Sequence, residues 1–385
     1  MILRILPILL LLILLPDFYI YRHYMRRHKD FTRSKRILWW IPSAVMMLFT
    51  FWMALQRTFA PTNGSVLLVY LLMMCILVMP KVIYAFCSAI GLGYCRMTHS
   101  HRNYGNLIGF FLSIFMVYVA LYGFSVGPRR FTVRQEEFAS KELPKSFDGY
   151  RIVQFTDAHV GSLPVSLLKK AVDSINAQKP DMIVFTGDLQ NMQPDELDAV
   201  VPILSQLKAT DGVLSILGNH DYPFYLNADY ATAALNEAKM KQKQHDMGWH
   251  LLLNENVNVK RNGERIFFAG MENESLKPEQ TRSDLPKTMA GIPKGAFVVM
   301  LQHEPTAWRR TILPKTEAQV TLSGHTHGGQ LELFGWSPAS LSYNEYGGHY
   351  QENKRALLVS TGLGGLVPFR FGVTPEIVVI TLRNR

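Results

Sequence analysis

The chain has 385 residues, and 48% of them are hydrophobic, which is enough for a large core or for membrane-spanning segments. The formal net charge of +10 comes from residues 1–130, which hold 14 Lys or Arg and 2 Asp or Glu, whereas residues 131–385 hold 26 and 28. The second part lacks the excess positive charge that a nucleic-acid partner requires, and because all three cysteines lie in the first part, it also lacks disulfides and thiol metal ligands.

Four apolar stretches of membrane-spanning length occur in the first part of the chain. They cover about residues 2–21, 37–59, 65–90 and 107–126, and they predict a membrane domain over residues 1–126. The first stretch can be a signal peptide or a retained helix. Because Pro16-Asp17-Phe18-Tyr19 is unlike a small-residue cleavage site, we interpret it as a retained helix.

The third stretch contains Pro80-Lys81, a proline and a charge inside an apolar run. Either the helix ends near Met79 with Lys81 at the membrane interface, or Lys81 faces the helix bundle. An interfacial lysine is the more ordinary arrangement, and it is our expectation.

The loops between these stretches differ in charge, which predicts orientation because Lys and Arg concentrate on the cytoplasmic side. Seven Lys or Arg lie between the first two stretches, none lies in residues 60–64, and Arg96 and Arg102 lie in residues 91–106. This pattern predicts that the amino terminus and everything after residue 126 are extracytoplasmic, although Arg129 and Arg130 oppose it.

Residues 127–148 are polar and charged, and we expect them to form a linker. Residues 149–385 alternate strand and helix patterns, which is typical of one α/β domain. Strands are expected at 151–156, 182–186, 213–217, 265–269, 298–302, 320–323, 356–360 and 376–382, and helices near 167–175, 195–208 and 228–243, with His245 and His250 in the loop after the last helix.

Five of the expected strands end abruptly in polar side chains. Because α/β sheets place their chemistry at the carboxyl ends of strands, these side chains are candidates for one site. They are Asp157, His159, Asp188, Asn219, His303, His325 and His327. This oxygen and imidazole set, without sulfur, suits two divalent first-row metals with open positions for water. Two such ions about 3.5–4 Å apart can hold an oxyanion and turn a bridging water into hydroxide, which is the chemistry of phosphoester hydrolysis.

The order of these residues resembles the calcineurin-like metallophosphoesterase family, whose blocks are Asp-x-His, Gly-Asp, Gly-Asn-His-Asp/Glu, His and Gly-His-x-His. All five blocks are present, and the resemblance covers residues 150–382. It implies a two-sheet α/β/β/α sandwich after the transmembrane helices. It also implies two divalent ions (Mn, Fe, Zn or Co), one held by Asp157, His159, Asp188 and His327 and the other by Asp188, Asn219, His303 and His325.

The resemblance implies roles for two residues beside the ions. His220 stabilises the charge on the phosphate or protonates the leaving oxygen, and Asp221 orients its ring. Arg370 can meet a phosphate from a loop, but a solvated or carboxylate-paired arginine fits the sequence equally well.

The form Gly-His-Thr-His-Gly-Gly-Gln at 324–330, Gly-Leu-Gly at 362–364 and the membrane anchor resemble a bacterial membrane-associated branch of the family, some members of which cleave the pyrophosphate of UDP-diacylglucosamine. We therefore expect a multi-pass protein of the bacterial inner membrane. We expect it to hydrolyse a phosphomonoester or a phosphodiester by attack of a metal-bound hydroxide. We expect the substrate to be lipid-linked or to contain a pyrophosphate. The alternative is a membrane sensor or assembly module whose metal domain binds a phosphorylated ligand without turnover.

Overall fold

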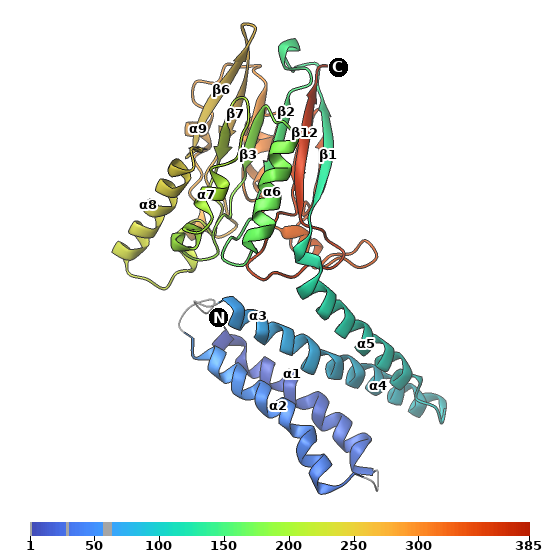
Figure 1. Cartoon of the computed structure of the whole chain (residues 1–385). Helices are drawn as coiled ribbons and strands as arrows, with labels where there is room; N and C mark the ends of the chain where they lie inside the picture. Colours follow the sequence, from blue (N-terminus) through green and yellow to red (C-terminus); the bar gives the residue numbers. More distant parts are fainter. Residues whose placement is uncertain (1, 28–30, 57–63) are drawn as a thin grey trace. The chain divides into compact units, whose positions relative to one another are not determined.

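The computed structural model describes residues 2–27, 31–56 and 64–385. The chain divides into two compact units, a helical unit that ends at Ser125 and an α/β unit from Val126 to Arg385 (Figure 1). Residues 57–63, which include the end of the second apolar stretch and most of the uncharged loop, lie outside the described residues.

The helical unit has four segments that are long and apolar enough to cross a membrane, as predicted. They are Ile5–His23, Arg33–Ala54, Ser65–Thr98 and Tyr104–Arg129. The helices are α1 Ile2–His23, α2 Arg33–Ala54, α3 Gly64–Met73, the π-helix η2 Met74–Val78, α4 Met79–Thr98 and α5 Tyr104–Ser125. The third segment continues through Pro80 because this residue lies in the first turn of α4, where a backbone N–H is not needed.

Lys81 faces the helix bundle and not a membrane interface, so the expectation for this residue is wrong. Its Nζ lies 2.8 Å from Asp17 Oδ1 and 3.4 Å from Ser43 Oγ, and Asp17 is fully buried. The Ser43 hydroxyl also donates a hydrogen bond to the Asp17 carboxylate. The positive charge of the lysine and the negative charge of the aspartate neutralise each other inside apolar surroundings. The two residues lie on different helices, so the sequence of one helix does not indicate the pair.

Lys81→Met is expected to destabilise the protein by about 3–5 kcal/mol, because Asp17 would remain as an unpaired buried charge. The double variant Lys81→Met/Asp17→Leu removes both charges and is expected to recover most of that loss. Unfolding of the detergent-solubilised protein by SDS, followed by circular dichroism, measures both variants. Equal destabilisation of the single and the double variant would contradict the pairing.

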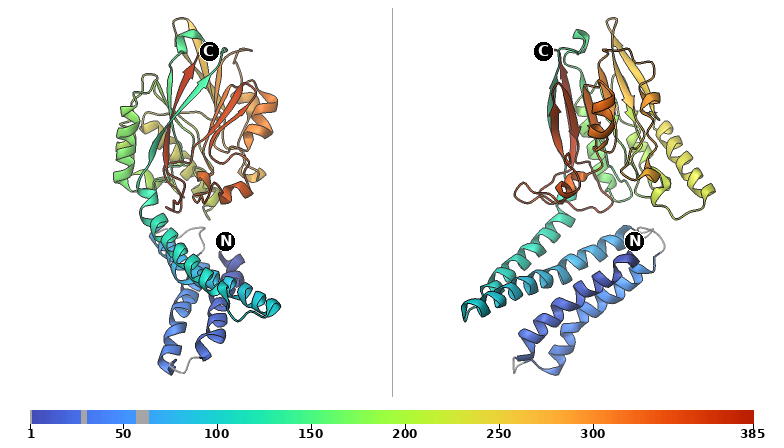
Figure 2. Two further views of the ribbon diagram at one scale, coloured as in Figure 1. Left: turned by 90° about the vertical axis from the view of Figure 1, so that its right-hand side faces the viewer. Right: turned by 180° about the vertical axis from the view of Figure 1, so that it is seen from behind.

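Two six-stranded sheets form the centre of the α/β unit, and their facing sides share a core (Figures 1 and 2). The first sheet has the order β1-β12-β2-β3-β4-β5, with bounds β1 Thr132–Ala139, β12 Glu376–Arg383, β2 Arg151–Phe155, β3 Met182–Phe185, β4 Val213–Ser215 and β5 His250–Leu251. The second has the order β10-β11-β9-β8-β7-β6, with bounds β10 Gly348–Glu352, β11 Arg355–Val359, β9 Val320–Ser323, β8 Val298–Leu301, β7 Glu264–Gly270 and β6 Glu255–Arg261. The predicted two-sheet fold is confirmed.

Helices cover the outer faces of the sheets. They are α6 Val165–Ala177, α7 Val201–Leu204, α8 Tyr230–Asp246, α9 Leu285–Thr288 and α10 Leu313–Lys315. The helix expected over 195–208 is instead broken into Pro194–Leu197 and Val201–Leu204, because Pro202 has no N–H with which to continue a helix from the preceding turn. His245 lies in α8 and His250 in β5, so neither is in the loop expected to hold it.

Short single-turn segments connect these elements. They are η1 Met25–Arg27, η3 Gly127–Arg129, η4 Lys145–Phe147, η5 Pro194–Leu197, η6 Pro223–Tyr225, η7 Pro278–Gln280, the π-helix η8 Trp308–Ile312, η9 His327–Gly329 and η10 Pro338–Leu341.

The segment expected to be a linker, 127–148, belongs to the first sheet. Its residues 132–139 form β1, which pairs in parallel with β12 over eight residues from Thr132↔Glu376 to Ala139↔Arg383. Phe138 is buried in the core between the sheets, and Arg134 forms an ion pair with Glu376 at 2.9 Å. An edge strand exposes one side to water and therefore contains polar residues, so its sequence does not show the apolar run that predicts a buried strand.

The strands that precede the predicted ligands all stop at one end of the unit. β2, β3 and β4 run parallel in the first sheet, and β7, β8 and β9 run parallel in the second. The segments after them, 156–159, 186–191, 218–221, 302–304 and 324–330, lie side by side, as in the hydrogen bond from the His325 N–H to the Asp157 carboxylate at 3.0 Å. We call this end of the α/β unit the carboxyl edge and the opposite end the amino edge.

Candidate metal centre

All seven predicted ligands lie together at the carboxyl edge. Ligand atoms of Asp157, His159 and His327 lie within 4.8 Å of one another and make a first group, and those of Asp188, His303 and His325 do the same and make a second group. The amide oxygen of Asn219 lies 3.1 Å from His303 Nε2 and 2.8 Å from His325 Nδ1, so Asn219 belongs to the second group.

Asp188 lies between the two groups. Its Oδ2 is 3.6 Å from His159 Nε2 and 3.2 Å from His303 Nε2. One carboxylate oxygen therefore faces an imidazole of each group. This is the position from which a carboxylate can bridge two neighbouring ions.

Hydrogen bonds behind the imidazoles fix which nitrogen faces the centre. His303 Nδ1 donates to the Thr186 carbonyl oxygen at 2.7 Å, and His159 Nδ1 donates to Asn191 Oδ1 at 3.1 Å. The other nitrogen of His159, Nε2, is buried without a hydrogen-bond partner among the described residues. A buried polar atom of this kind is costly unless it binds something, and the surrounding oxygen and nitrogen donors fit a divalent cation.

The backbone is strained at most of these residues. Five of the seven predicted ligands have a positive φ: Asp157 (51°), His159 (44°), Asp188 (62°), His325 (75°) and His327 (53°). Residues other than glycine rarely adopt this conformation, which costs about 1–3 kcal/mol each and persists only where the surrounding structure enforces it. The surrounding structure therefore holds these residues in an unfavourable backbone conformation that directs their side chains toward one point.

Burial shifts the pKa values of ligands in the first group. It raises the pKa of Asp157 to about 6 and lowers the pKa of His159 to about 3. At pH 7 the carboxyl group is therefore ionised and the imidazole is neutral, which are the forms that bind a metal. At Asp188 burial also disfavours the charge, but His303, His220 and His159 together outweigh it and hold the pKa of Asp188 well below its usual range.

Asp221 does not orient the His220 ring, so the role expected for it is wrong. Its carboxylate accepts hydrogen bonds from the backbone N–H groups of Asp188 and Leu189, both at 2.8 Å, and of Gly218 at 2.9 Å. These bonds hold the loop after β3 against the turn after β4. Asp221 therefore positions the ligand Asp188 and has its own acceptor capacity filled by backbone donors.

A backbone carbonyl group orients His220 instead. The His220 Nδ1 donates a hydrogen bond to the Asn191 backbone carbonyl oxygen at 2.7 Å, and the imidazole ring stacks on the Tyr225 ring with centroids 4.5 Å apart. The ring of His159, a member of the first group, lies 4.9 Å from that of His220. Because Nδ1 is engaged, Nε2 is the nitrogen of His220 that can exchange a proton beside the centre.

Arg370 is not solvated and pairs with no carboxylate of the described residues, and its guanidinium group binds backbone carbonyl groups instead. It is almost fully buried, and it donates to the carbonyl oxygens of His327 (2.7 Å), Thr361 (2.7 Å) and Gly364 (2.6 Å). Burial lowers its pKa to about 10, so it keeps its charge at neutral pH. Arg370 ties the loop at 361–364 to the turn that carries His327.

Comparisons with known proteins agree with this geometry. Residues 150–329 match the family described as "Calcineurin-like phosphoesterase", and residues 3–128 match "Probable Calcineurin-like phosphoesterase, transmembrane domain". The chain is 33% identical over 276 residues to "Uncharacterized metallophosphoesterase YkuE" of Bacillus subtilis, an alignment that covers 68% of this chain and 90% of that protein. The chain belongs to the calcineurin-like phosphoesterase family.

Two further relatives have names that differ from one another. The chain is 28% identical over 276 residues to "Transmembrane protein with metallophosphoesterase domain" of Danio rerio, which covers 69% of this chain and 60% of that protein. It is 27% identical over 297 residues to "UDP-2,3-diacylglucosamine pyrophosphatase LpxG" of Chlamydia muridarum, which covers 62% of this chain and 86% of that protein. The chain is thus a membrane protein with a metal-dependent phosphoesterase domain, and the family predicted from its motifs is confirmed.

Three side chains that the sequence did not single out complete the site of this calcineurin-like phosphoesterase. Glu304 Oε2 and the Tyr343 hydroxyl lie 3.1 and 3.0 Å from His325 Nε2. The Tyr225 hydroxyl accepts a hydrogen bond from the Asn219 amide nitrogen at 2.8 Å, which turns the amide oxygen of Asn219 toward the second group. The only sequence signal for Glu304 was its position directly after His303, and the two tyrosines lie in loops without a motif.

Gly218→Ala is expected to disturb the centre of this phosphoesterase, because a Cβ on Gly218 would lie 2.3 Å from Asp188 Oδ1 and 2.8 Å from His303 Cε1. Overpacking of this kind costs about 1–3 kcal/mol. Thermal unfolding and metal analysis of the purified protein measure the effect. The control is Gly347→Ala, whose Cβ would meet nothing closer than 3.5 Å; equal behaviour of the two variants would contradict the close packing of Asp188 on Gly218.

Proposed function

We propose that this protein hydrolyses a phosphomonoester or a phosphodiester at a centre of two divalent metal ions. The substrate in this proposal is lipid-linked or contains a pyrophosphate. The observation that carries the proposal is the pair of ligand groups with Asp188 between them, 3.6 Å from His159 and 3.2 Å from His303. Its membership of the calcineurin-like phosphoesterase family supports the same reaction class.

The two ligand groups divide the ions between them in this proposal. Asp157, His159, Asp188 and His327 hold one ion, and Asp188, Asn219, His303 and His325 hold the other. Oxygen and imidazole donors accept Mn²⁺, Fe²⁺, Zn²⁺ and Co²⁺ alike. When bound, two such ions supply the Lewis acidity that stabilises the charge of a phosphoryl group during hydrolysis.

His220 is the proton donor to the leaving oxygen in this proposal. The Asn191 carbonyl oxygen, 2.7 Å from Nδ1, and the stacked Tyr225 ring hold the imidazole in one orientation next to the first group. Asp221 supports the reaction indirectly, since it fixes the backbone of Asp188.

The likeness to LpxG of Chlamydia muridarum, described as a UDP-2,3-diacylglucosamine pyrophosphatase, supports a lipid-linked substrate. A membrane anchor also raises the local concentration of such a substrate at the site. We further propose that the protein lies in the bacterial inner membrane with the α/β unit outside the cytoplasm, on the evidence of the basic first and third loops. That side would disfavour a cytosolic nucleotide sugar and favour a lipid phosphate or diphosphate.

The proposal is tested with the detergent-purified full chain and Mn²⁺. The substrates are bis-p-nitrophenyl phosphate, a phosphatidic acid, a polyprenyl diphosphate and UDP-2,3-diacylglucosamine, each also measured with Asp188→Asn. We expect at least one substrate to be hydrolysed by the natural chain and none by the variant. Binding of a phosphorylated compound without turnover of any of them would overturn the proposal and favour a sensor.

A further inference from the structure

Large apolar side chains are exposed at only one end of the α/β unit. Eight such residues are exposed among residues 126–385. Six lie at the carboxyl edge: Val126, Leu276, Phe334 and Trp336 in loops or turns, Leu341 at the end of η10 and Val165 at the start of α6. The other two, Tyr230 and Leu235, lie in the first two turns of α8, which starts at that edge. An asymmetric apolar surface of this kind is typical of a binding surface.

The most exposed of these residues occupies a backbone position that suits it poorly. Leu333 and Trp336 exchange backbone hydrogen bonds at 2.9 and 3.0 Å, so Phe334 and Gly335 form a two-residue turn. Both turn residues have positive φ, 53° and 78°, a geometry that favours asparagine followed by glycine. Phe334 is fully exposed, so no packing within the protein compensates for this placement.

The same turn geometry occurs at the amino edge with the expected residue. Asn262 and Gly263, with φ of 48° and 83°, connect the paired residues Arg261 and Glu264 of β6 and β7. The two turns differ in the chemistry of the first residue and in the end of the unit where they lie. The first turn residue is thus aromatic at the carboxyl edge and polar at the amino edge.

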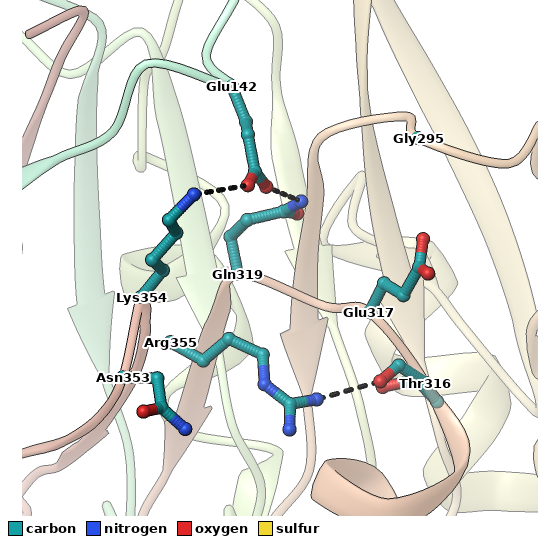
Figure 3. A pocket seen from close by; sticks show the side chains of 8 residues that line it. All are labelled: Glu142, Gly295, Thr316, Glu317, Gln319, Asn353, Lys354 and Arg355. Carbon is teal, nitrogen blue, oxygen red and sulfur yellow. Dashed lines mark hydrogen bonds and ion pairs between the residues drawn. The ribbon is translucent and has the colours of Figure 1, made fainter.

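The amino edge is polar in its hollows as well as in its turns. A hollow of about 560 Å³ lies there between the starts of β9 and β11, and Figure 3 shows Glu142 between Gln319 and Lys354. The Glu142 carboxylate accepts a hydrogen bond from Gln319 at 2.7 Å and lies 4.0 Å from Lys354 Nζ. Charged groups thus line the edge that faces away from the metal centre.

The carboxyl edge is also the end at which the chain enters the α/β unit. β1 runs parallel to β12, which runs antiparallel to β2, so the start of β1 lies at the edge where β2 ends. Gly127 packs there so closely against the Arg370 carbonyl oxygen that a Cβ would lie 1.8 Å from it. The last membrane segment, Tyr104–Arg129, leads directly into this point, so a tether of only a few residues connects that segment to the carboxyl edge.

We propose that the carboxyl edge rests on the surface of the lipid bilayer, with Phe334, Trp336 and Leu341 of the apolar loop, residues 331–341, in the interfacial region. Aromatic side chains favour this region, where their rings are apolar and their surroundings partly hydrated. The tether favours a bilayer over a soluble partner protein, because the chain enters this edge directly from its last membrane segment. The apolar loop follows the ligands His325 and His327 directly, so contact with lipid would bring the centre to phosphate groups at the membrane surface.

The test uses the full chain in nanodiscs of zwitterionic and anionic phospholipids. Cys75, Cys87 and Cys95, which form no disulfide, are replaced by alanine, and a nitroxide label is attached to Phe334→Cys or, as the matched control, to Asn262→Cys. Power-saturation electron paramagnetic resonance compares the access of oxygen, which concentrates in lipid, with that of a water-soluble nickel chelate. We expect a several-fold higher ratio of oxygen to nickel access at position 334 than at position 262.

Two results of this measurement would overturn the proposal. Equal ratios at the two positions would show that the apolar loop is in water, and protection of position 334 from both reagents would show that protein, either a second copy or a partner, covers it.

Should the cysteine-free chain fail to fold, a photoactivatable phospholipid applied to the natural chain tests the same contact between the apolar loop and lipid. Label in residues 331–341 that falls several-fold in Phe334→Asn supports lipid contact, and label that is unchanged in that variant overturns it. Phe334→Asn gives the turn its favoured residue, so loss of folding is not expected. Neither measurement depends on enzymatic activity.

Discussion

Asp188→Asn is expected to remove both metal ions and to lower turnover by more than about 100-fold, since even residues that only orient a metal ligand contribute 10–100-fold. The physical reason is the position of Oδ2, 3.6 Å from His159 Nε2 and 3.2 Å from His303 Nε2, between the two ligand groups. Asparagine has nearly the same volume but no negative charge, so it cannot neutralise two cations. Elemental analysis of the detergent-purified protein and its rate with bis-p-nitrophenyl phosphate measure the two effects.

The matched control is Asp173→Asn, which removes a carboxylate from the exposed face of α6. It is expected to keep the metal content and the rate of the natural chain. If Asp188→Asn retained two ions per chain, the bridging position assigned to Asp188 would be wrong. Retention of one ion would mean that only one of the two groups depends on this residue.

The clustering of the seven predicted ligands was predictable from the sequence because each of them follows a short apolar strand. Such strands are buried, and a parallel arrangement brings their carboxyl ends to one edge. Residues far apart in the chain, such as Asp157 and His325, therefore meet without any signal that pairs them. The positive φ values at five of these residues were not predictable, since they depend on contacts made after folding.

Several of the predictions that failed concern groups whose partners lie on another element. Lys81 is paired with Asp17 on a different helix, and Arg370 with three backbone carbonyl groups. The Asp221 carboxylate binds backbone N–H groups. Nearly every residue has such a group, so the sequence does not indicate which ones Asp221 binds. β1 was missed for a related reason, because an edge strand is defined by its neighbour and not by its own apolar content.

His220→Ala is expected to keep both ions and to lose turnover by about 10²–10⁴-fold, the range for loss of a general acid. The imidazole Nδ1 is engaged by the Asn191 carbonyl oxygen at 2.7 Å, and His220 is outside both ligand groups. The proton it supplies matters most for a leaving group that is a strong base, such as an alkoxide. The loss is therefore expected to be large for an alkyl phosphodiester and small for bis-p-nitrophenyl phosphate, whose leaving group departs without a proton.

The comparison with Asn219→Ala separates a proton donor from a ligand at adjacent positions. Asn219 Oδ1 lies 3.1 Å from His303 Nε2 and 2.8 Å from His325 Nδ1, so its loss should weaken the ion of the second group and be partly recovered by excess Mn²⁺. No amount of Mn²⁺ should recover His220→Ala if its role is to donate a proton. Recovery of His220→Ala by Mn²⁺, together with an ion missing from the purified variant, would make His220 a ligand. A loss that is the same for good and poor leaving groups would instead mean that His220 stabilises charge on the phosphate without transferring a proton.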